Sequence, residues 1–154
     1  MASIAMFDNT IVTELPDDFS DLPSALLLTM FPNEMRPQVI KGSSDGSFVT
    51  FSLIQKSLSG QQLFVVSRNA QSLLQKLHPD CYNQRIHIIP LEDSSCAWFS
   101  FMAQGKKNIL FIISIEDRML LGSCCCAEDD HMRYNEIKMA FLSVKATRRQ
   151  EGKR

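Results

Sequence analysis

Long apolar segments are missing from this sequence. The longest uninterrupted apolar run, Ile109 to Ile113, has the length of a strand and falls far short of the roughly 18 residues that a membrane-spanning helix requires. The first ten residues lack both the basic region and the apolar stretch of a secretory signal peptide. We therefore expect neither export nor membrane association, and the cytoplasm is the predicted location.

Paired cysteine motifs are also missing, although the chain has 5 cysteines. An odd number of cysteines without an export signal indicates free thiols in a reducing compartment. Structural zinc sites use ligand pairs separated by two to four residues, and no two cysteines have that spacing. The glycine-rich sequences that bind phosphate are absent as well. We predict no metal, no cofactor and no catalytic residue.

No internal repeat and no linker rich in Pro, Gly or Ser divides the 154 residues, which is the usual size of a single domain. The net charge of −1 predicts no overall attraction to nucleic acid or anionic lipid. The last ten residues contain five basic residues and one acidic residue, which leaves +4 on them and −5 on the remainder. We predict one α+β domain at residues 1–147 and a basic tail at 148–154. The tail is either a solvated terminus or a site for phosphate or an acidic partner.

The first half of the chain has the pattern of short elements separated by turns. Weak alternation predicts a strand at 10–15, and a short helix at 25–31 follows a proline near its start and ends before Pro32. A glycine-containing loop at 42–46 predicts a hairpin of 38–41 with 48–55.

Two longer helices are predicted. The first, Gln61 to Leu77, follows Ser59 and Gln62, which have the spacing of a capping box, and stops before Pro79. Its apolar residues recur at helical spacing: Leu63, Val66, Ala70, Leu73, Leu74 and Leu77. The second helix is expected from about His131 to Lys145, with Asp129 or Asp130 as its cap. Its apolar stripe is Ile137, Ala140, Phe141 and Val144.

Four strands are predicted in quick succession at 85–91, 95–103, 108–115 and 118–127. Their connections are shorter than the dozen or so residues that a parallel crossover needs, so they form an antiparallel meander. Both faces of 108–115 are apolar, which predicts a central strand covered on both sides. The expected fold class is α+β, with an antiparallel sheet of about six to seven strands flanked by helices on both faces, an α/β/α sandwich.

Three consecutive cysteines, Cys124 to Cys126, are the most conspicuous cluster. Neighbouring strand residues point to opposite faces, so Cys124 and Cys126 share one side and Cys125 takes the other. Core packing of small apolar thiols is the favoured interpretation. Redox sensing, nucleophilic catalysis and a Cys/Cys/His metal set stay open as alternatives. The nucleophile would pair with His78, His87 or His131, and the metal set would be completed by His131.

The remaining polar and aromatic candidates have simple structural explanations. Glu116-Asp117 and the acidic run 128–130 lie at strand ends, where turns and helix caps account for them better than acid–base chemistry or calcium binding. Trp98 is either packed under a helix or part of a partner surface, where tryptophan is enriched. The candidate partner-binding residues are Trp98, Arg148 and Arg149.

The order of elements and several short phrases resemble the Mog1/PsbP-like fold, in particular its small bacterial members of unassigned function and the DcrB-type relatives. The phrases are residues 15–21 (LPDDFSD), 31–32 (FP), 36–40 (RPQVI) and 117–124 (DRMLLGSC), together with a mid-chain helix ending in Pro79 and a closing amphipathic helix. The resemblance implies an antiparallel sheet between helices. Relatives of this shape serve as a Ran-binding factor, a photosystem accessory protein or chaperone-like adaptors for secreted toxins, so it also implies a binding role. The acidic, glutamine-containing stretch of the Ran-binding members is missing, and no functional residue carries over.

These observations predict a non-enzymatic protein-interaction module, such as an adaptor or a chaperone for another protein. Nucleic acid is not the expected partner, because the sequence shows no basic stripe interleaved with aromatic residues. The alternative is a cysteine-dependent enzyme or redox sensor that uses the Cys124–Cys126 run. A homo-oligomer joined through a sheet edge is a third possibility.

Overall fold

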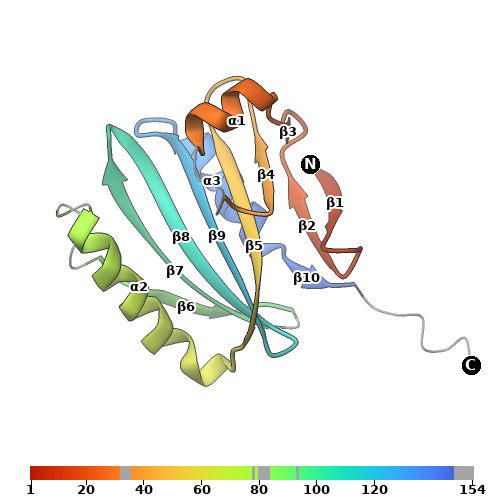
Figure 1. The fold of residues 1–154 in the computed structure, drawn as a ribbon, viewed down its shortest axis with the longest axis vertical. Coiled ribbons are helices and arrows are strands. Elements are labelled where there is room, and N and C mark those ends of the chain that lie inside the picture. Colours follow the sequence, from red (N-terminus) through yellow and green to blue (C-terminus); the bar gives the residue numbers. More distant parts are fainter. Residues whose placement is uncertain (32–35, 78, 80–83, 93, 148–154) are drawn as a thin grey trace, which may run out of the picture.

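The computed structural model describes residues 1–31, 36–77, 79, 84–92 and 94–147, apart from the side chains of residues 28, 29, 55 and 56 (Figure 1). Seven strands form an antiparallel sheet in the order β3-β4-β5-β9-β8-β7-β6, and three form a smaller sheet in the order β1-β2-β10. The predicted α+β class and antiparallel sheet are confirmed. In the described part of the chain, no helix is long and apolar enough to cross a membrane.

The elements have the following bounds. The large sheet consists of β3 (Ser20–Asp21), β4 (Val39–Gly42), β5 (Phe48–Ser57), β6 (His87–Pro90), β7 (Ser94–Ala103), β8 (Lys106–Ile115) and β9 (Arg118–Ala127). The small sheet consists of β1 (Ala2–Met6), β2 (Ile11–Leu15) and β10 (Lys145–Ala146). The helices are α1 (Ser24–Met30), α2 (Leu63–Leu77), which follows the 3-10 turn η1 (Gly60–Gln62), and α3 (His131–Leu142).

The predicted meander is confirmed, because β6, β7, β8 and β9 pair consecutively and antiparallel. Tight turns make this possible: Gln104-Gly105 and Glu116-Asp117 all have positive φ, as the turns that best match strand twist require. The β8 strand lies inside the sheet, and its residues 109–115 are buried except for the half-buried Leu110. Both sides of this strand are therefore buried over residues 111–115, and the side that carries Leu110 is only partly covered nearer the start of the strand.

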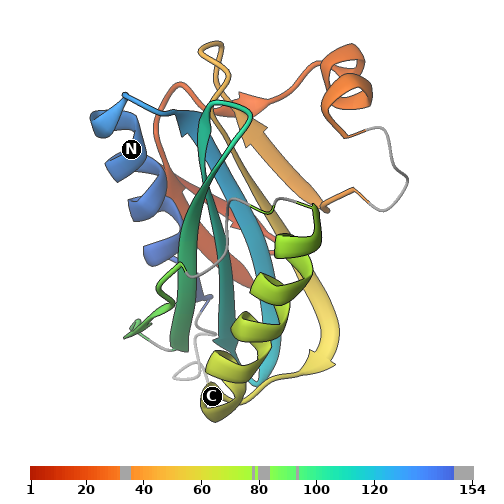
Figure 2. The same ribbon diagram turned by 90° about the vertical axis from the view of Figure 1, so that its left-hand side faces the viewer.

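Alternate residues of β8 belong to two separate cores. Phe111 lies in the larger cluster, where its ring stacks on Phe141 of α3 with centroids 4.8 Å apart. Ile112 lies in the smaller cluster with Leu63 of α2. Figure 2 shows α3 and the small sheet on one side of the large sheet, and α1 and α2 on the other. We call these sides the α3 face and the α2 face.

Cover on the α2 face is uneven. The α2 helix packs mainly over β7 and β8, and its buried residues are Leu63, Ser67 and Gln71. The predicted stripe is therefore wrong in its second half, where the side chains of Leu73 and Leu77 are 64% and 76% exposed. The helix is turned because the Gln71 side chain donates a hydrogen bond to the backbone carbonyl of Gln84 at 2.6 Å, which draws that flank of the helix onto the protein.

Helix boundaries follow the predicted caps closely but not fully. Asp130 is the cap of α3, since its side chain accepts a hydrogen bond from the Arg133 N–H at 3.0 Å. The Gln62 side chain accepts one from the Ser59 N–H at 3.0 Å. The α3 helix ends at Leu142, three residues before the predicted end, because Lys145 and Ala146 pair with β2 instead.

The small sheet was not predicted, apart from β2. The β1 strand pairs with β2 through a turn in which Phe7, Asp8 and Asn9 all have positive φ. Phe7 is a poor sequence signal for that conformation, which favours glycine or asparagine. The β3 strand, only two residues long, was also missed.

Candidate functional site

Trp98 lies on the α3 face, half-buried between two other rings. The β6–β7 register places His87 directly opposite Trp98, and the two rings stack with centroids 4.3 Å apart. Phe141 of α3 contacts Trp98 edge to face, with centroids 6.0 Å apart. Trp98 therefore packs against a helix, one of the two predicted placements, while part of its side chain stays open to solvent.

Two lysines and a tyrosine extend this stack into a continuous row. Tyr134 and Lys138 are four residues apart on α3, so they share one face of the helix. The Lys138 ammonium lies 5.0 Å from the Trp98 ring centroid and 5.4 Å from that of Tyr134. The Lys107 ammonium lies 4.1 Å from the Tyr134 centroid. We call the row His87–Trp98–Lys138–Tyr134–Lys107 the Trp98 strip.

The Trp98 strip is positively charged and lacks a carboxylate. Among the described residues, no salt bridge involves Lys107, Lys138 or the nearby Arg85. Burial lowers the pKa of His87, and the charges of Arg85 and Lys138 lower it further, so this ring is neutral near pH 7. The strip therefore presents ammonium groups beside flat aromatic rings, an arrangement in which each cation–π contact contributes about 0.5–1 kcal/mol.

The Trp98 strip could not be recognised from the order of residues in the sequence. No basic stripe interleaved with aromatic residues is visible in the linear sequence, yet the fold gathers one from β6, β7, β8 and α3. The only available signal was the strand alternation that puts Trp98 and Lys107 on one side of the meander. Arg148 and Arg149, the other candidate partner-binding residues, lie outside the described residues.

The cysteines are placed as predicted. Cys124 and Cys126 belong to the larger core, whereas Cys125 lines a pocket on the α2 face. All four described cysteines are buried and free of disulfides. Burial raises the pKa of the Cys96 thiol to about 12 and that of Cys126 to about 11, and raises the pKa values of Cys124 and Cys125 as well. A reactive cysteine needs the opposite shift. Cys81 lies outside the described residues.

The described histidine and acidic candidates do not assemble into a metal-binding cluster. The described residues contain no group of three His, Cys, Asp or Glu side chains that could hold a metal ion. His131 is exposed at the start of α3, and His78 lies outside the described residues. Glu116 forms a turn and an ion pair with Arg118 at 2.8 Å, and Asp130 caps α3. The turn and cap interpretations of the acidic residues are confirmed.

An ion network around Arg133 was missed. Its guanidinium donates to Asp18 near β3, to Asp45 in the β4–β5 turn at 3.0 Å and to Glu136 at 3.1 Å. The Arg133 side chain is 11% exposed, and its guanidinium carbon lies 4.9 Å from the centroid of the Phe19 ring. The network ties α3 to the far edge of the sheet. Its hydrogen-bonded pairs lie up to 115 residues apart in sequence, so no local pattern could have indicated it.

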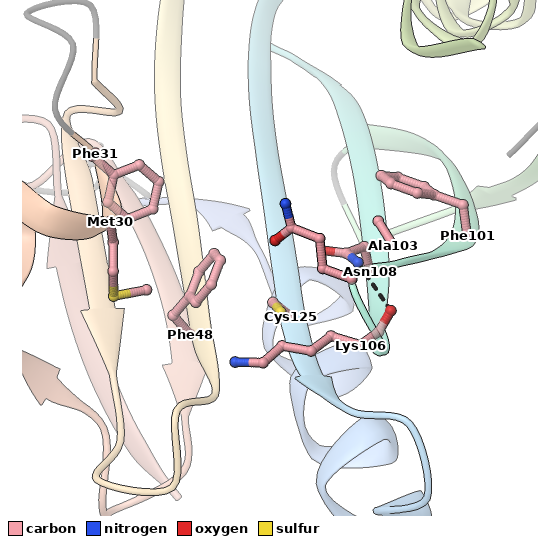
Figure 3. A pocket seen from close by; sticks show the side chains of 9 residues that line it. Met30, Phe31, Phe48, Phe101, Ala103, Lys106, Asn108 and Cys125 are labelled. Carbon is pink, nitrogen blue, oxygen red and sulfur yellow. Dashed lines mark hydrogen bonds between the residues drawn. The ribbon is translucent and has the colours of Figure 1, made fainter. Parts of the chain in front are cut away.

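A pocket of about 480 Å³ opens on the α2 face, between α1 and the β7–β8 turn (Figure 3). Its lining comes from α1, β5, β7, β8 and β9: Met30, Phe31, Phe48, Phe101, Ala103, Gln104, Lys106, Asn108 and Cys125. Strand alternation could have grouped Phe48, Asn108 and Cys125, because the sheet register pairs Phe48 with Cys125 and Asn108 with Cys125. The contribution of α1 had no sequence signal.

No protein-family model matches the chain, and neither does any curated protein. A crystal structure of a protein from Bacteroides thetaiotaomicron VPI-5482, determined at 1.50 Å resolution, is similar with a TM-score of 0.55 and 11% sequence identity. The match covers 98% of this chain and 49% of that chain, so this protein spans about half the length of that structure. At this identity the likeness concerns the fold alone: the chain shares its architecture with part of a larger bacterial protein.

Proposed function

We propose that the protein is a non-enzymatic protein-interaction module that binds an acidic segment of another protein along the Trp98 strip. The observation that carries this proposal is the gathering of Arg85, Lys107 and Lys138 around two aromatic rings, with no salt bridge to any of the three in the described part of the chain. Cations without a salt-bridge partner among the described residues are available to a partner outside the protein.

An acidic peptide with apolar side chains fits both components of the strip. Its carboxylates would pair with the Lys107 and Lys138 ammonium groups, and its apolar side chains would contact the open part of Trp98. Tryptophan and tyrosine contribute much of the binding energy at protein interfaces. Complementary charge adds specificity and speeds association.

A protein segment suits this surface better than a nucleic acid. The strip is short, and the body of the chain carries −5. A long phosphate backbone would extend beyond the cations and meet repulsion from that acidic body. A peptide of a few residues would not.

The architecture gives the same proposal indirect support. The α2 and α3 helices pack against separate cores on β8, which favours an α/β/α sandwich of the Mog1/PsbP-like kind. The resemblance to that fold favours an adaptor or chaperone-like role. Free buried thiols suit a reducing compartment such as the cytoplasm. The alternative, a cysteine-dependent enzyme or redox sensor, is disfavoured because burial raises the pKa of each described thiol.

The experiment uses the single tryptophan of the chain as its own reporter. Fluorescence of Trp98 would be recorded while a peptide of alternating Glu and Phe is added, with the Gln–Phe peptide as the uncharged match. We expect the acidic peptide to bind at least tenfold more tightly, and added salt to weaken it, because the contacts are ionic and largely exposed.

Paired variants locate the binding site. Lys107→Gln combined with Lys138→Gln should weaken the acidic peptide about tenfold, whereas Lys76→Gln on α2 should leave its affinity unchanged. Equal binding of the Glu and Gln peptides, or no binding of either, would overturn the proposal. So would a single-stranded oligouridylate that binds more tightly than the acidic peptide, because the strip would then be a nucleic-acid site.

A further inference from the structure

The described residues of the pocket on the α2 face provide an apolar wall and a single charged group. Phe31 and Phe48 meet edge to face with centroids 5.6 Å apart, and Met30 extends the wall on the α1 side. Figure 3 shows the Phe31 and Phe48 side chains on one side of the pocket and the Asn108 side chain on the other, with Cys125 between them. An apolar ligand would find flat hydrocarbon on one side and amide groups on the other.

Among the described lining residues, Lys106 is the one that carries a charge. Its side chain reaches across β9 toward β5, and its ammonium lies 3.6 Å from the position that a Cβ on Gly46 would occupy (Figure 3). The ammonium is close enough to Cys125 to oppose the effect of burial on the pKa of that thiol. The Lys106 side chain is exposed and lies at the mouth of the pocket.

No described carboxylate neutralises Lys106. It appears in none of the salt bridges within the described ranges. Asp45, the residue before Gly46, already accepts hydrogen bonds from the Arg133 guanidinium at 3.0 Å and from the Ser47 N–H at 2.8 Å. The ammonium at the pocket mouth is thus available to an anion.

We propose that this pocket binds a small apolar carboxylic acid, with the hydrocarbon part against Phe31 and Phe48 and the carboxylate paired with Lys106. A volume of about 480 Å³ lies in the range of ordinary ligand sites, which are mostly apolar with a few polar groups that fix orientation. The amides of Gln104 and Asn108 provide further donors at the charged end. The Asn108 amide already donates to the Lys106 carbonyl at 3.1 Å, which holds it beside the ammonium.

A carboxylate suits the site better than a phosphate or a neutral amphiphile. A single ammonium matches a single negative charge, whereas a phosphate site normally gathers several donors or a helix N-terminus. A neutral ligand would leave the ammonium unpaired beside the apolar wall. This proposal is independent of the Trp98 strip, because the pocket and the strip lie on opposite faces of the sheet.

The probes are phenylbutyrate and the matched neutral compound phenylbutanol, titrated into the full chain and followed by calorimetry and by amide chemical shifts. We expect phenylbutyrate to bind at least tenfold more tightly, because one charge-assisted hydrogen bond has about that effect. Its shifts should concentrate at Phe31, Phe48 and Asn108.

Adjacent lysines provide the control. Lys106→Gln should abolish the preference for phenylbutyrate, and Lys107→Gln should keep it, because Lys107 is on the other face. For the acidic peptide we expect the reverse: Lys107→Gln weakens its binding and Lys106→Gln does not. The two proposals can therefore succeed or fail separately. Equal binding of the two compounds, failure of both to bind, or an equal effect of the two lysine variants would overturn the pocket proposal.

Discussion

The two faces of the large sheet use the same strands for different purposes. On the α3 face, a larger core lies under α3 and the small sheet, and charged groups occupy its rim: Arg133 at one side and the Trp98 strip at the other. On the α2 face, four of the described residues form the buried cluster, and a less covered part of the sheet opens into a pocket. The larger core and this pocket therefore lie on opposite sides of the same sheet.

Lys106 and Lys107 illustrate how a strand produces this division. They are neighbours in the sequence, and each lies within reach of a different set of aromatic rings. Because successive strand residues point to opposite faces, a shift of one residue in register would exchange their surroundings. The dense antiparallel pairing of β7, β8 and β9 fixes that register.

The largest expected effect separates the two cores on one strand. Phe111→Ala should lower the free energy of unfolding by about 4 kcal/mol, because the ring is fully buried, stacks on Phe141 and passes over Gly122. Leu110→Ala, one residue away on the half-covered α2 face, should lower it by about 1 kcal/mol. Urea unfolding followed by Trp98 fluorescence measures both. Equal losses would show that the two cores are not distinct in stability.

Thiol reactivity gives the next comparison. In a Cys81→Ser background, the buried Cys126 should react with a disulfide reagent about hundredfold more slowly than the same thiol in urea, because its pKa is raised from 9.0 to about 11. Cys125, on the pocket side and near Lys106, should be the first described thiol to react. Rates are read from reagent release, with mass spectrometry to identify the site. A thiol that reacts faster in the folded protein than in urea would support the alternative of a cysteine-dependent enzyme.

The elements that could be predicted from the sequence are those specified by local pattern. Alternation and short connections defined the β6–β9 meander, and a capping signal placed the start of α3. The predicted apolar stripe of α2 was wrong at Leu73 and Leu77. A hydrogen bond from Gln71 to Gln84, which lies outside the helix, decides which flank of α2 is buried. Local periodicity shows that a helix has an apolar side but not how far that side is turned.

The candidate site was less accessible because its parts come from distant segments. Trp98 was singled out by residue type alone, without His87, Lys107 or Lys138, which only the β6–β7 register and the packing of α3 bring to it. The small sheet was not predicted for a related reason. Its strand β10 is two residues long and forms because β2 is available to pair with it. Such short strands are products of the tertiary structure rather than causes of it.

The last comparison concerns the Arg133 network, which joins α3 to the opposite edge of the sheet. The α2 face has no counterpart, because no salt bridge among the described residues involves α2. Arg133→Met should lower the free energy of unfolding by about 2 kcal/mol at neutral pH, since it leaves Asp18 and Asp45 without their common donor. Lys41→Met is the control: it removes the ion pair with the highly exposed Asp21, so its effect should be close to zero.

The pH dependence of this difference distinguishes an ionic role of Arg133 from a packing role. Hydrogen bonding from Arg133 lowers the pKa of Asp18 from 3.8 to about 2 in the folded protein. A carboxylate with a depressed folded-state pKa stabilises the protein above its unfolded pKa, and this contribution disappears as the pH falls from about 4 toward 2. Urea midpoints of the native protein and Arg133→Met should therefore converge over that interval, while the gap between native protein and Phe111→Ala stays constant. If the difference in urea midpoint between the native protein and Arg133→Met is unchanged at low pH, the Arg133 side chain acts through its packing on Phe19 and not through its charge.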